Sequence, residues 1–145
     1  MSEELRIRRA EQHDAVRLAE LSGTLGYPTS AEFLGGTLQR ILARDIDVVL
    51  VAEAGGTVVG WLHGAEQELL EIGRRCEILG LVVDDQRRGL GAGRKLVDAI
   101  ECWARARGLT EVSVRSNIIR AESHPFYLRI GFHREKTQHA YRKAL

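Results

Sequence analysis

The sequence predicts an α+β fold of three layers, in which strands and about four helices form a single domain over residues 1–145. Three observations carry this prediction. Segments that alternate like half-buried strands are interleaved with segments of helical periodicity. Gly55-Gly56 lies between two apolar runs, which is typical of a tight hairpin turn. The length of 145 residues suits one hydrophobic core and is too short for two ordinary ones.

The first part of the chain predicts one strand and two helices. Residues 5–8 alternate like a strand, and residues 11–25 carry helix formers, with Val16 placed on the expected apolar face. Thr29 and Glu32 have the spacing of a capping box, and the apolar residues that follow repeat with helical spacing. A second helix is therefore expected after residue 29.

The rest of the chain predicts further strands on either side of a longer amphipathic helix, with a short helix near the end. The remaining strands are expected at residues 48–52, 58–62, 76–83 and 111–115 and from Phe132 onward, and the remaining helices at 94–107 and 125–130.

A glycine-spaced turn joins the strand at 76–83 to the helix at 94–107. Gly89, Gly91 and Gly93 stand at every second position, so backbone N–H groups can close around a phosphate where the helix dipole already favours an anion. Positive charge is added by Arg87, Arg88, Arg94 and Lys95. The spacing argues against a dinucleotide fingerprint and a P-loop, because Arg94 stands where the first needs glycine and no Ser or Thr follows Lys95. A phosphorylated ligand is expected here.

The pattern that fits is Arg88-x-x-Gly91-x-Gly93 between a strand and a helix, and it resembles the acyl-CoA pyrophosphate loop of the GNAT family of N-acetyltransferases. Phe126-Tyr127-x-x-x-Gly131-Phe132 is similar to the C-terminal signature of the family, and the resemblance covers residues 77–132 without an insertion. Asp85 stands where many members carry Pro. The resemblance implies a mixed, mostly antiparallel sheet of six to seven strands, splayed between the fourth and fifth, with the two early helices as a V-shaped pair over the acceptor pocket.

The resemblance also implies acetyl-CoA as the acyl donor and no metal. The backbone of Leu81 to Val83 would run along the pantetheine arm, and an N–H near Val82 or Val83 would polarise the thioester carbonyl. Family members often use an Asn after the fifth strand, which suggests Asn117, although Arg120 stands at the usual Asn position. The predicted cofactor-binding residues are Leu81, Val82, Val83, Arg87, Arg88, Gly89, Leu90, Gly91, Ala92, Gly93, Arg94, Asn117 and Tyr127.

The predicted catalytic residues are Tyr127, Glu77 and His124. Tyr127 matches the family position whose phenol lies near the thiol sulfur, and the alternative is an ordinary packed aromatic residue.

Strand alternation places Glu77 on one face with Leu79, Leu81 and Val83, where a carboxylate needs a partner or binds a proton more readily. Glu77 could deprotonate the amine through a water, or could form a salt bridge with Arg74 or Arg75.

His124 is a second candidate base, because it lies three residues before Tyr127, or else a packing residue at the start of a helix. The other histidines are interpreted as surface or structural. The general base stays open between Glu77, His124 and a water.

Composition limits the other functions. A net charge of +1 argues against nucleic-acid binding, and the chain has neither an apolar run of membrane-spanning length nor the features of a signal peptide. A cytoplasmic protein is expected. Cys76 and Cys102 have no disulfide or zinc spacing, and Cys102 is expected to be a small buried thiol. Direct transfer in a ternary complex is therefore favoured over an acyl-cysteine.

The sequence thus predicts an acetyl-CoA-dependent N-acetyltransferase that acts on the primary amine of a small molecule. The alternatives are a protein or peptide N-acetyltransferase, a non-catalytic acyl-CoA-binding module, and an unrelated nucleotide-binding protein. A cationic acceptor could be attracted by acidic residues. These are Asp45, Glu66, Glu68 and Glu71. The resemblance also allows a homodimer through residues 133–145, because family members often dimerise, sometimes by pairing or exchanging the C-terminal strand.

Overall fold

The computed structural model describes residues 4–87, 89–116 and 123–145, with the backbone alone at 123 and 124. The chain forms two compact units, Met1–Val114 and Arg115–Leu145, and each is described by itself. The first unit contains β1 (Leu5–Arg9), η1 (Gln12–Asp14), α1 (Ala15–Thr24), α2 (Ala31–Leu42), β2 (Asp47–Ala54), β3 (Thr57–Leu69), β4 (Gly73–Val83), η2 (Asp85–Arg87), α3 (Ala92–Ala106) and β5 (Val112–Val114). The second unit contains α4 (Ser123–Arg129).

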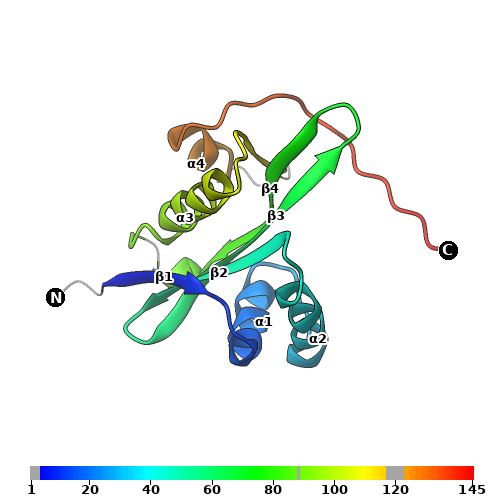
Figure 1. Ribbon diagram of the computed structural model, residues 1–145. Coiled ribbons are helices and arrows are strands. Elements are labelled where there is room, and N and C mark those ends of the chain that lie inside the picture. Colours follow the sequence, from blue (N-terminus) through cyan, green and yellow to red (C-terminus); the bar gives the residue numbers. More distant parts are fainter. Residues whose placement is uncertain (1–3, 88, 117–122) are drawn as a thin grey trace. The chain divides into compact units, whose positions relative to one another are not determined.

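The five strands of the first unit form one sheet in the order β1-β2-β3-β4-β5. Neighbouring strands are antiparallel except for β4 and β5, which are parallel. Helices α1 and α2 lie on one face of the sheet and α3 lies on the other (Figure 1). This arrangement confirms the predicted three-layer α+β class with a mixed, mostly antiparallel sheet.

The sheet is smaller than predicted. The strand expected from Phe132 onward is wrong, because residues 133–145 form neither helix nor strand and are exposed along their whole length. A strand is stable when a neighbour satisfies its backbone N–H and C=O groups, and alternation in a sequence cannot show whether such a neighbour exists. The described residues therefore contain five strands instead of six to seven.

The hairpin between β2 and β3 has the predicted turn. Ala54 pairs with Thr57, and Gly55 and Gly56 have φ angles of 59° and 79°. Positive φ at both central residues is the geometry of a type I′ turn, which side chains disfavour and glycine adopts readily.

The predicted start of α2 and the predicted apolar face of α1 both need correction. Ser30, and not Thr29, caps α2, since its Oγ accepts the Phe33 N–H at 3.0 Å. Val16 is 58% exposed. The face of α1 that packs on the sheet carries Ala15, Leu18 and Leu21 instead, and Val16 lies outside this buried stripe.

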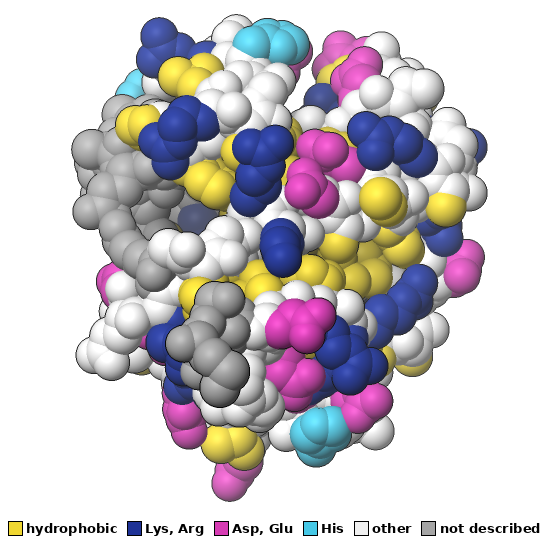
Figure 2. Space-filling model, turned by 90° about the vertical axis from the view of Figure 1, so that its left-hand side faces the viewer, with side chains coloured by type: hydrophobic (Ala, Val, Ile, Leu, Met, Phe, Trp, Pro, Cys, Tyr) yellow, Lys and Arg dark blue, Asp and Glu magenta, His cyan; other side chains and the backbone are white. Residues whose placement is uncertain are grey.

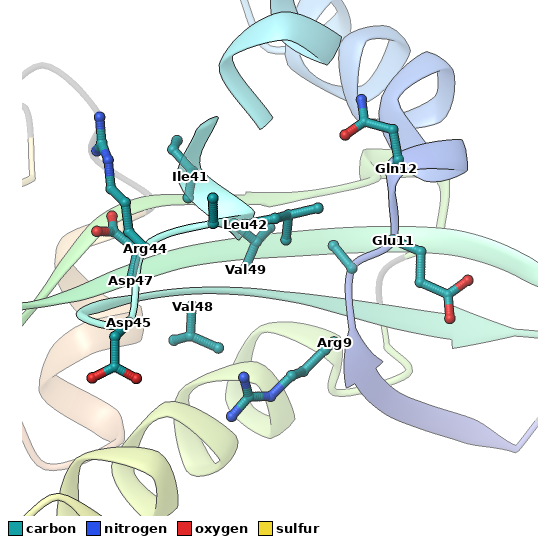
Figure 3. A pocket seen from close by; sticks show the side chains of 12 residues that line it. Arg9, Glu11, Gln12, Ile41, Leu42, Arg44, Asp45, Asp47, Val48 and Val49 are labelled. Atoms are coloured by element: carbon teal, nitrogen blue, oxygen red, sulfur yellow. The ribbon is translucent and has the colours of Figure 1, made fainter. Parts of the chain in front are cut away.

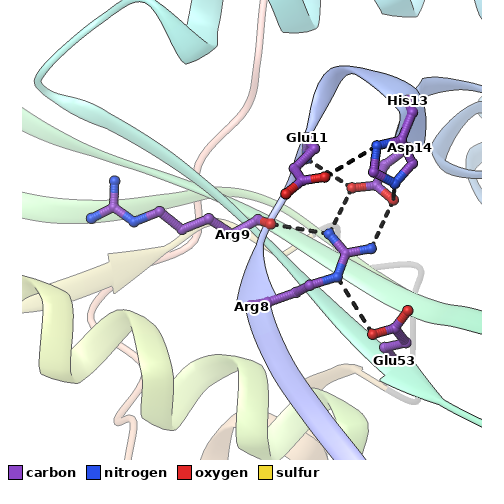
Figure 4. Close-up of polar contacts among 6 residues, drawn as sticks. All are labelled: Arg8, Arg9, Glu11, His13, Asp14 and Glu53. Carbon is purple, nitrogen blue, oxygen red and sulfur yellow. Dashed lines mark hydrogen bonds and ion pairs between the residues drawn. The ribbon is translucent and has the colours of Figure 1, made fainter. Parts of the chain in front are cut away.

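A nearly buried ion pair joins β1 to the start of α1 (Figure 4). Arg8 donates two hydrogen bonds of 2.9 Å to the Asp14 carboxylate, which also accepts the Glu11 N–H at 2.8 Å. On its other side, Arg8 lies 3.5 Å from Glu53 of β2. Burial alone would raise the pKa of Asp14, but the hydrogen bonds from Arg8 and Glu11 outweigh it and hold that pKa below its ordinary value.

Asp14→Asn is expected to lower the free energy of unfolding at pH 7 by about 1–3 kcal/mol, since the variant loses the charged partner of Arg8. A carboxyl group with a lowered native-state pKa stabilises the fold above its unfolded-state pKa, and this stability is lost as the pH falls through the native value. Urea unfolding at pH 7 and below pH 4 should therefore show that the difference in the free energy of unfolding between wild type and variant is smaller in acid. Glu20→Gln on α1, an exposed carboxylate paired with Arg17, is the control and should stay within about 0.5 kcal/mol of wild type. A difference in the free energy of unfolding between wild type and Asp14→Asn that is equal at both pH values would contradict this account.

Candidate functional site

One edge of β4 is open at its C-terminal end. β5 pairs with β4 only over Cys76–Ile78, whereas β4 continues to Val83, so in the described part of the chain no strand covers that edge beyond Ile78. The Asp84 N–H bonds the Val59 carbonyl of β3 at 2.8 Å. By antiparallel alternation, Leu81 and Val83 then direct their backbone groups toward the open edge. This is the predicted splay between the fourth and fifth strands, and an extended ligand could bond there like an added strand.

Asp84 shapes the turn that follows β4. Its carboxylate accepts the Gln86 N–H at 3.0 Å, and its carbonyl accepts the Arg87 N–H at 3.0 Å. Arg17 of α1 donates to the Asp84 carboxylate at 3.1 Å and to the Val58 carbonyl at 2.8 Å. These bonds hold the turn in place, although Asp85 stands where many GNAT sequences carry Pro.

The glycine loop leads directly into α3. Gly89 and Gly91 have φ angles of 90° and 75°, a left-handed conformation that other residues rarely adopt. Gly91 is the N-cap of α3 and has no side chain to cap it, so the N–H groups of the first turn point toward the loop. Arg94 and Lys95 are exposed on that turn. The geometry fits an anion such as a pyrophosphate, and Arg88 lies outside the described residues.

The side of the molecule on which α3 begins is not uniformly basic. Figure 2 shows Lys and Arg side chains there interspersed with Asp and Glu side chains. The attraction for an anion is therefore local to the loop, as the net charge of +1 indicates.

A β-bulge in β4 decides which way Glu77 points. Gly64 of β3 pairs with Ile78 and His63 pairs with Gly80, so Leu79 is an extra residue that interrupts the alternation. Glu77 consequently shares a face with Gly80 and Val82. The prediction that it shares one with Leu79, Leu81 and Val83 is wrong, because strict alternation ignores the bulge.

Glu77 is buried on the face of the sheet that also carries α1 and α2. Its Oε1 lies 3.4 Å from Arg75 and accepts the Ser113 hydroxyl at 3.1 Å. The ion pair expected with Arg74 or Arg75 therefore forms with Arg75, and Arg74 instead binds Glu66.

A second polar pair lies on the same face. His63 Nε2 is 2.7 Å from Asp47 Oδ2, and the register pairs Asp47 with Ala65 and Ala65 with Glu77. The interpretation of His63 as an ordinary surface or structural residue missed this pair. Its signal in the sequence was weak, since a second bulge at Val59 shifts the register of β2 and β3.

The Asp47 side also borders a hollow of about 650 Å³ between the end of β1 and the end of α2 (Figure 3). Apolar residues Ile41, Val48 and Val49 form part of its lining. The charged residues that line it are Arg9, Glu11, Arg44, Asp45 and Asp47.

The acidic residues suggested as an attraction for a cationic acceptor are partly engaged elsewhere. Glu66 accepts hydrogen bonds from Arg74 at 2.8 Å and Arg107 at 3.1 Å, which lower its pKa to about 2. Glu66 pairs with Cys76, whereas Glu77 belongs to the alternate set of β4 residues. Glu66 therefore projects from the face of the sheet that carries α3 and cannot act beside Glu77.

Neither cysteine is placed as an acyl carrier. Cys76 is fully buried, and burial together with Glu77 and Glu66 raises its pKa to about 11, so the reactive thiolate is rare. Cys102 is exposed, and the prediction that it is buried is wrong. The buried stripe of α3 runs through Leu96, Ile100 and Ala104 and leaves position 102 outside it.

In the second unit, Tyr127 lies on α4 in an aromatic cluster. Its ring makes edge contacts with Phe126 and Phe132, at centroid distances of 5.2 and 5.6 Å. The Tyr127 carbonyl accepts the Phe132 N–H at 3.0 Å. The predicted residues Asn117 and Arg120, and the His124 side chain, lie outside the described residues.

Among the helices that the structure describes, none is both long and apolar enough to cross a membrane.

Comparison with known proteins adds independent findings. The model of the acetyltransferase (GNAT) family matches residues 10–132. Over 85 residues the chain is 33% identical to "Probable N-acetyltransferase family 8 member 5" of Mus musculus, and this match covers 58% of the chain and 37% of that relative. The chain thus spans well under half the length of the relative.

Solved structures share the fold at low sequence identity. An aminoglycoside N-acetyltransferase, AAC(6')-Iy in complex with CoA, superposes with a TM-score of 0.88 at 18% identity and covers 100% of this chain and 98% of its own. AAC(6')-Ih from Acinetobacter baumannii superposes with a TM-score of 0.85 at 17% identity, and the match covers 98% of this chain and 99% of that one. Glucosamine-6-phosphate N-acetyltransferase from Arabidopsis thaliana superposes with a TM-score of 0.82 at 23% identity, and the match covers 96% of this chain and 98% of that one.

Proposed function

The chain belongs to the acetyltransferase (GNAT) family, and we propose that it transfers an acetyl group from acetyl-CoA to the primary amine of a small molecule, directly in a ternary complex. The observation that carries the proposal is the open edge of β4, which runs into a left-handed glycine loop and the uncapped start of α3. One continuous surface thus offers strand-like bonds for an extended arm and N–H groups for phosphates.

The first unit supplies the groups that would hold the donor. Leu81 and Val83 would bond the pantetheine arm through their backbones, and one of their N–H groups would polarise the acyl carbonyl. Gly89 and Gly91 let the loop approach the phosphates closely, while Arg87 and Arg94 add charge. The thioester supplies an acyl group that is already activated, so the remaining requirements are positioning and proton transfer.

Tyr127 is proposed as the acid that protonates the departing sulfur. Glu77 is proposed to attract the ammonium group of the acceptor and to help remove its proton through a water, because a buried carboxylate favours a nearby cation. His124 stays the second candidate for this role. The predicted cytoplasmic location and homodimer are kept as predictions.

Glu77→Gln is expected to lower turnover about 100-fold while the affinity for acetyl-CoA changes little. Glutamine keeps the size of the side chain and can still accept the Ser113 hydroxyl, so the main loss is the negative charge. Steady-state kinetics over a range of pH measures the effect, with the exposed Glu135→Gln as the control. A pH–rate profile that does not differ from that of wild type would rule out Glu77 as a participant in proton removal.

The function itself is tested by incubating acetyl-CoA with a panel of primary amines and measuring free thiol and acetylated product by mass spectrometry. Amino sugars and aminoglycosides come first in the panel, since similar structures are those of enzymes named for such acceptors. Peptides with free N-termini or lysines test the protein-directed alternative. One thiol released per acetylated amine is expected. Tight acetyl-CoA binding with no transfer to any acceptor would instead favour a non-catalytic acyl-CoA-binding module.

A further inference from the structure

We propose that His63, oriented by Asp47, accepts the proton that the acceptor amine loses before it attacks the acetyl group. The inference rests on the proposed acetyl transfer and adds a catalytic residue that sequence reasoning did not select. It places Glu77 as the group that attracts the ammonium and His63 as the group that finally takes the proton.

The bond between the two side chains fixes the tautomer of His63. Asp47 is 4% exposed, His63 is 19% exposed, and the 2.7 Å contact joins His63 Nε2 to Asp47 Oδ2. An ionised carboxylate only accepts hydrogen bonds, so Nε2 carries the hydrogen and Nδ1 is left with a lone pair. Within the described residues, nothing bonds Nδ1. A histidine held in this way by a carboxylate is well suited to accept a proton.

The sheet register puts the His63 side chain on the same face as Glu77. His63 pairs with Gly80 of β4, and because of the bulge at Leu79 it shares a face with Glu77. The residue after Gly80 is Leu81, whose backbone faces the open edge. Neighbouring strands lie about 5 Å apart, so an amine bound beyond that edge, like an added strand, is about two strand spacings, or roughly 10 Å, from β3, and a short chain of waters would connect it to the imidazole.

The Trp61 ring covers the backbone of Gly80, the residue of β4 that pairs with His63, since a Cβ at this position would lie 2.8 Å from the ring. The Trp61 Nε1–H is buried and has no partner among the described residues. A polar acceptor group bound beside His63 could satisfy this donor, which adds a second reason to place the acceptor on this face.

Glu77 is already engaged by other groups. It is buried and accepts hydrogen bonds from Arg75 and Ser113. Asp47 borders the hollow of about 650 Å³, so the pair also adjoins an opening toward solvent. The Asp47–His63 pair therefore shares a face with the carboxylate that attracts the ammonium and adjoins a route by which the proton can leave.

The proton balance is simple. One ammonium proton passes to His63 Nδ1, and the neutral amine forms the C–N bond as the C–S bond breaks. Tyr127, the proposed acid, gives its proton to the departing sulfur. A second proton from the same amine nitrogen then restores the Tyr127 hydroxyl. The imidazolium then gives its proton to water. The sum is one ammonium and one thioester converted to one amide, one thiol and one released proton.

His63→Gln separates proton transfer from structure. The glutamine amide can donate to Asp47 as Nε2 does, but it has no basic nitrogen. We expect turnover to fall about 100-fold, with the KM for acetyl-CoA and the melting temperature nearly unchanged. In His63→Gly, added imidazole should restore part of the lost turnover, whereas Glu77→Gln should not respond to it. The control is His13→Gln, an exposed histidine that also lies beside a carboxylate, 3.1 Å from Glu11.

Turnover of His63→Gln equal to wild type, or no rescue of a folded His63→Gly, would overturn the role of His63 alone. A wild type that acetylates no amine in the panel would overturn the proposed function instead. Long-range ¹⁵N–¹H NMR of the free wild type provides a readout that needs no turnover. We expect the Nε2–H tautomer of His63, and an Nδ1–H tautomer would contradict the inference even for an active enzyme.

Discussion

Gly91→Glu is expected to weaken acetyl-CoA binding by at least about 100-fold. Gly91 has a φ of 75°, and a side chain in this left-handed region costs about 1–2 kcal/mol. The added carboxylate would also repel phosphates at the point where the N–H groups of α3 should attract them. Each 1.4 kcal/mol corresponds to about a tenfold change in affinity, so the expected loss of about 2.8 kcal/mol comes from this repulsion and from the shift of the loop that would relieve the strain. Calorimetric titration of the folded variant measures it.

The hairpin turn supplies a matched control for this variant. Gly56 has a φ of 79° and, like Gly91, no atom within 4 Å of the place where a Cβ would stand. Gly56→Glu therefore introduces the same charge and nearly the same backbone strain at a site that the proposed ligand does not touch. It should bind acetyl-CoA like wild type. An equal loss in both variants would mean that strain or net charge, and not the loop, explains the effect.

Tyr127→Phe is expected to lower turnover about 100-fold and to leave the affinity for acetyl-CoA nearly unchanged. Phenylalanine keeps the ring contacts with Phe126 and Phe132, so the main change is the loss of the hydroxyl group that would protonate sulfur. Single-turnover kinetics at saturating acceptor reports this step directly.

Tyr141→Phe removes the same hydroxyl from a side chain that is 92% exposed, and it should behave like wild type. If Tyr127→Phe turned over as fast as Tyr141→Phe at saturating substrate, Tyr127 would have no part in the chemistry and the packed-aromatic interpretation would hold.

Local signals in the sequence predicted the elements that depend on short-range geometry. Gly55-Gly56 predicted the turn between β2 and β3, because two consecutive positive φ angles strongly favour glycine. The glycine spacing after residue 88 likewise predicted a loop that leads into a helix, and Gly89 and Gly91 adopt the left-handed conformation that this requires. These features need no information about distant parts of the chain.

The sequence did not predict the two β-bulges, at Val59 and Leu79, and these bulges determine which side chains lie on the same face of the sheet. The Ala54–Thr57 pair, extended without interruption, would place Asp47 opposite Gly64. The bulge at Val59 moves the register by one residue, so that Asp47 lies opposite Ala65 and within reach of His63. A bulge adds one unpaired residue to a strand and increases the local twist, and the sequence of one strand does not show where it falls. Alternation alone therefore misplaced Glu77 and missed the Asp47–His63 pair.

Two other predictions, the cap of α2 and the apolar face of α1, were wrong because neighbouring residues suit the same position equally well. Thr29 and Ser30 can both cap a helix, and the observed cap is the residue whose oxygen reaches the Phe33 N–H. The apolar face of α1 was misplaced at Val16, because Val16 and Leu18 are both apolar and only packing against the sheet decides between them. Such choices depend on packing that a linear pattern does not contain.

The central claim is that the open edge of β4 and the glycine loop form a coenzyme A site, and a calorimetric titration of wild type with acetyl-CoA tests it most directly. ATP and NAD are titrated in parallel, because an unrelated nucleotide-binding protein would prefer one of them. We expect micromolar binding of acetyl-CoA at one site per chain, tighter than that of either nucleotide. Folded wild-type protein that binds no acetyl-CoA, or that binds ATP or NAD more tightly, would contradict the claim and leave only the fold in common with the family.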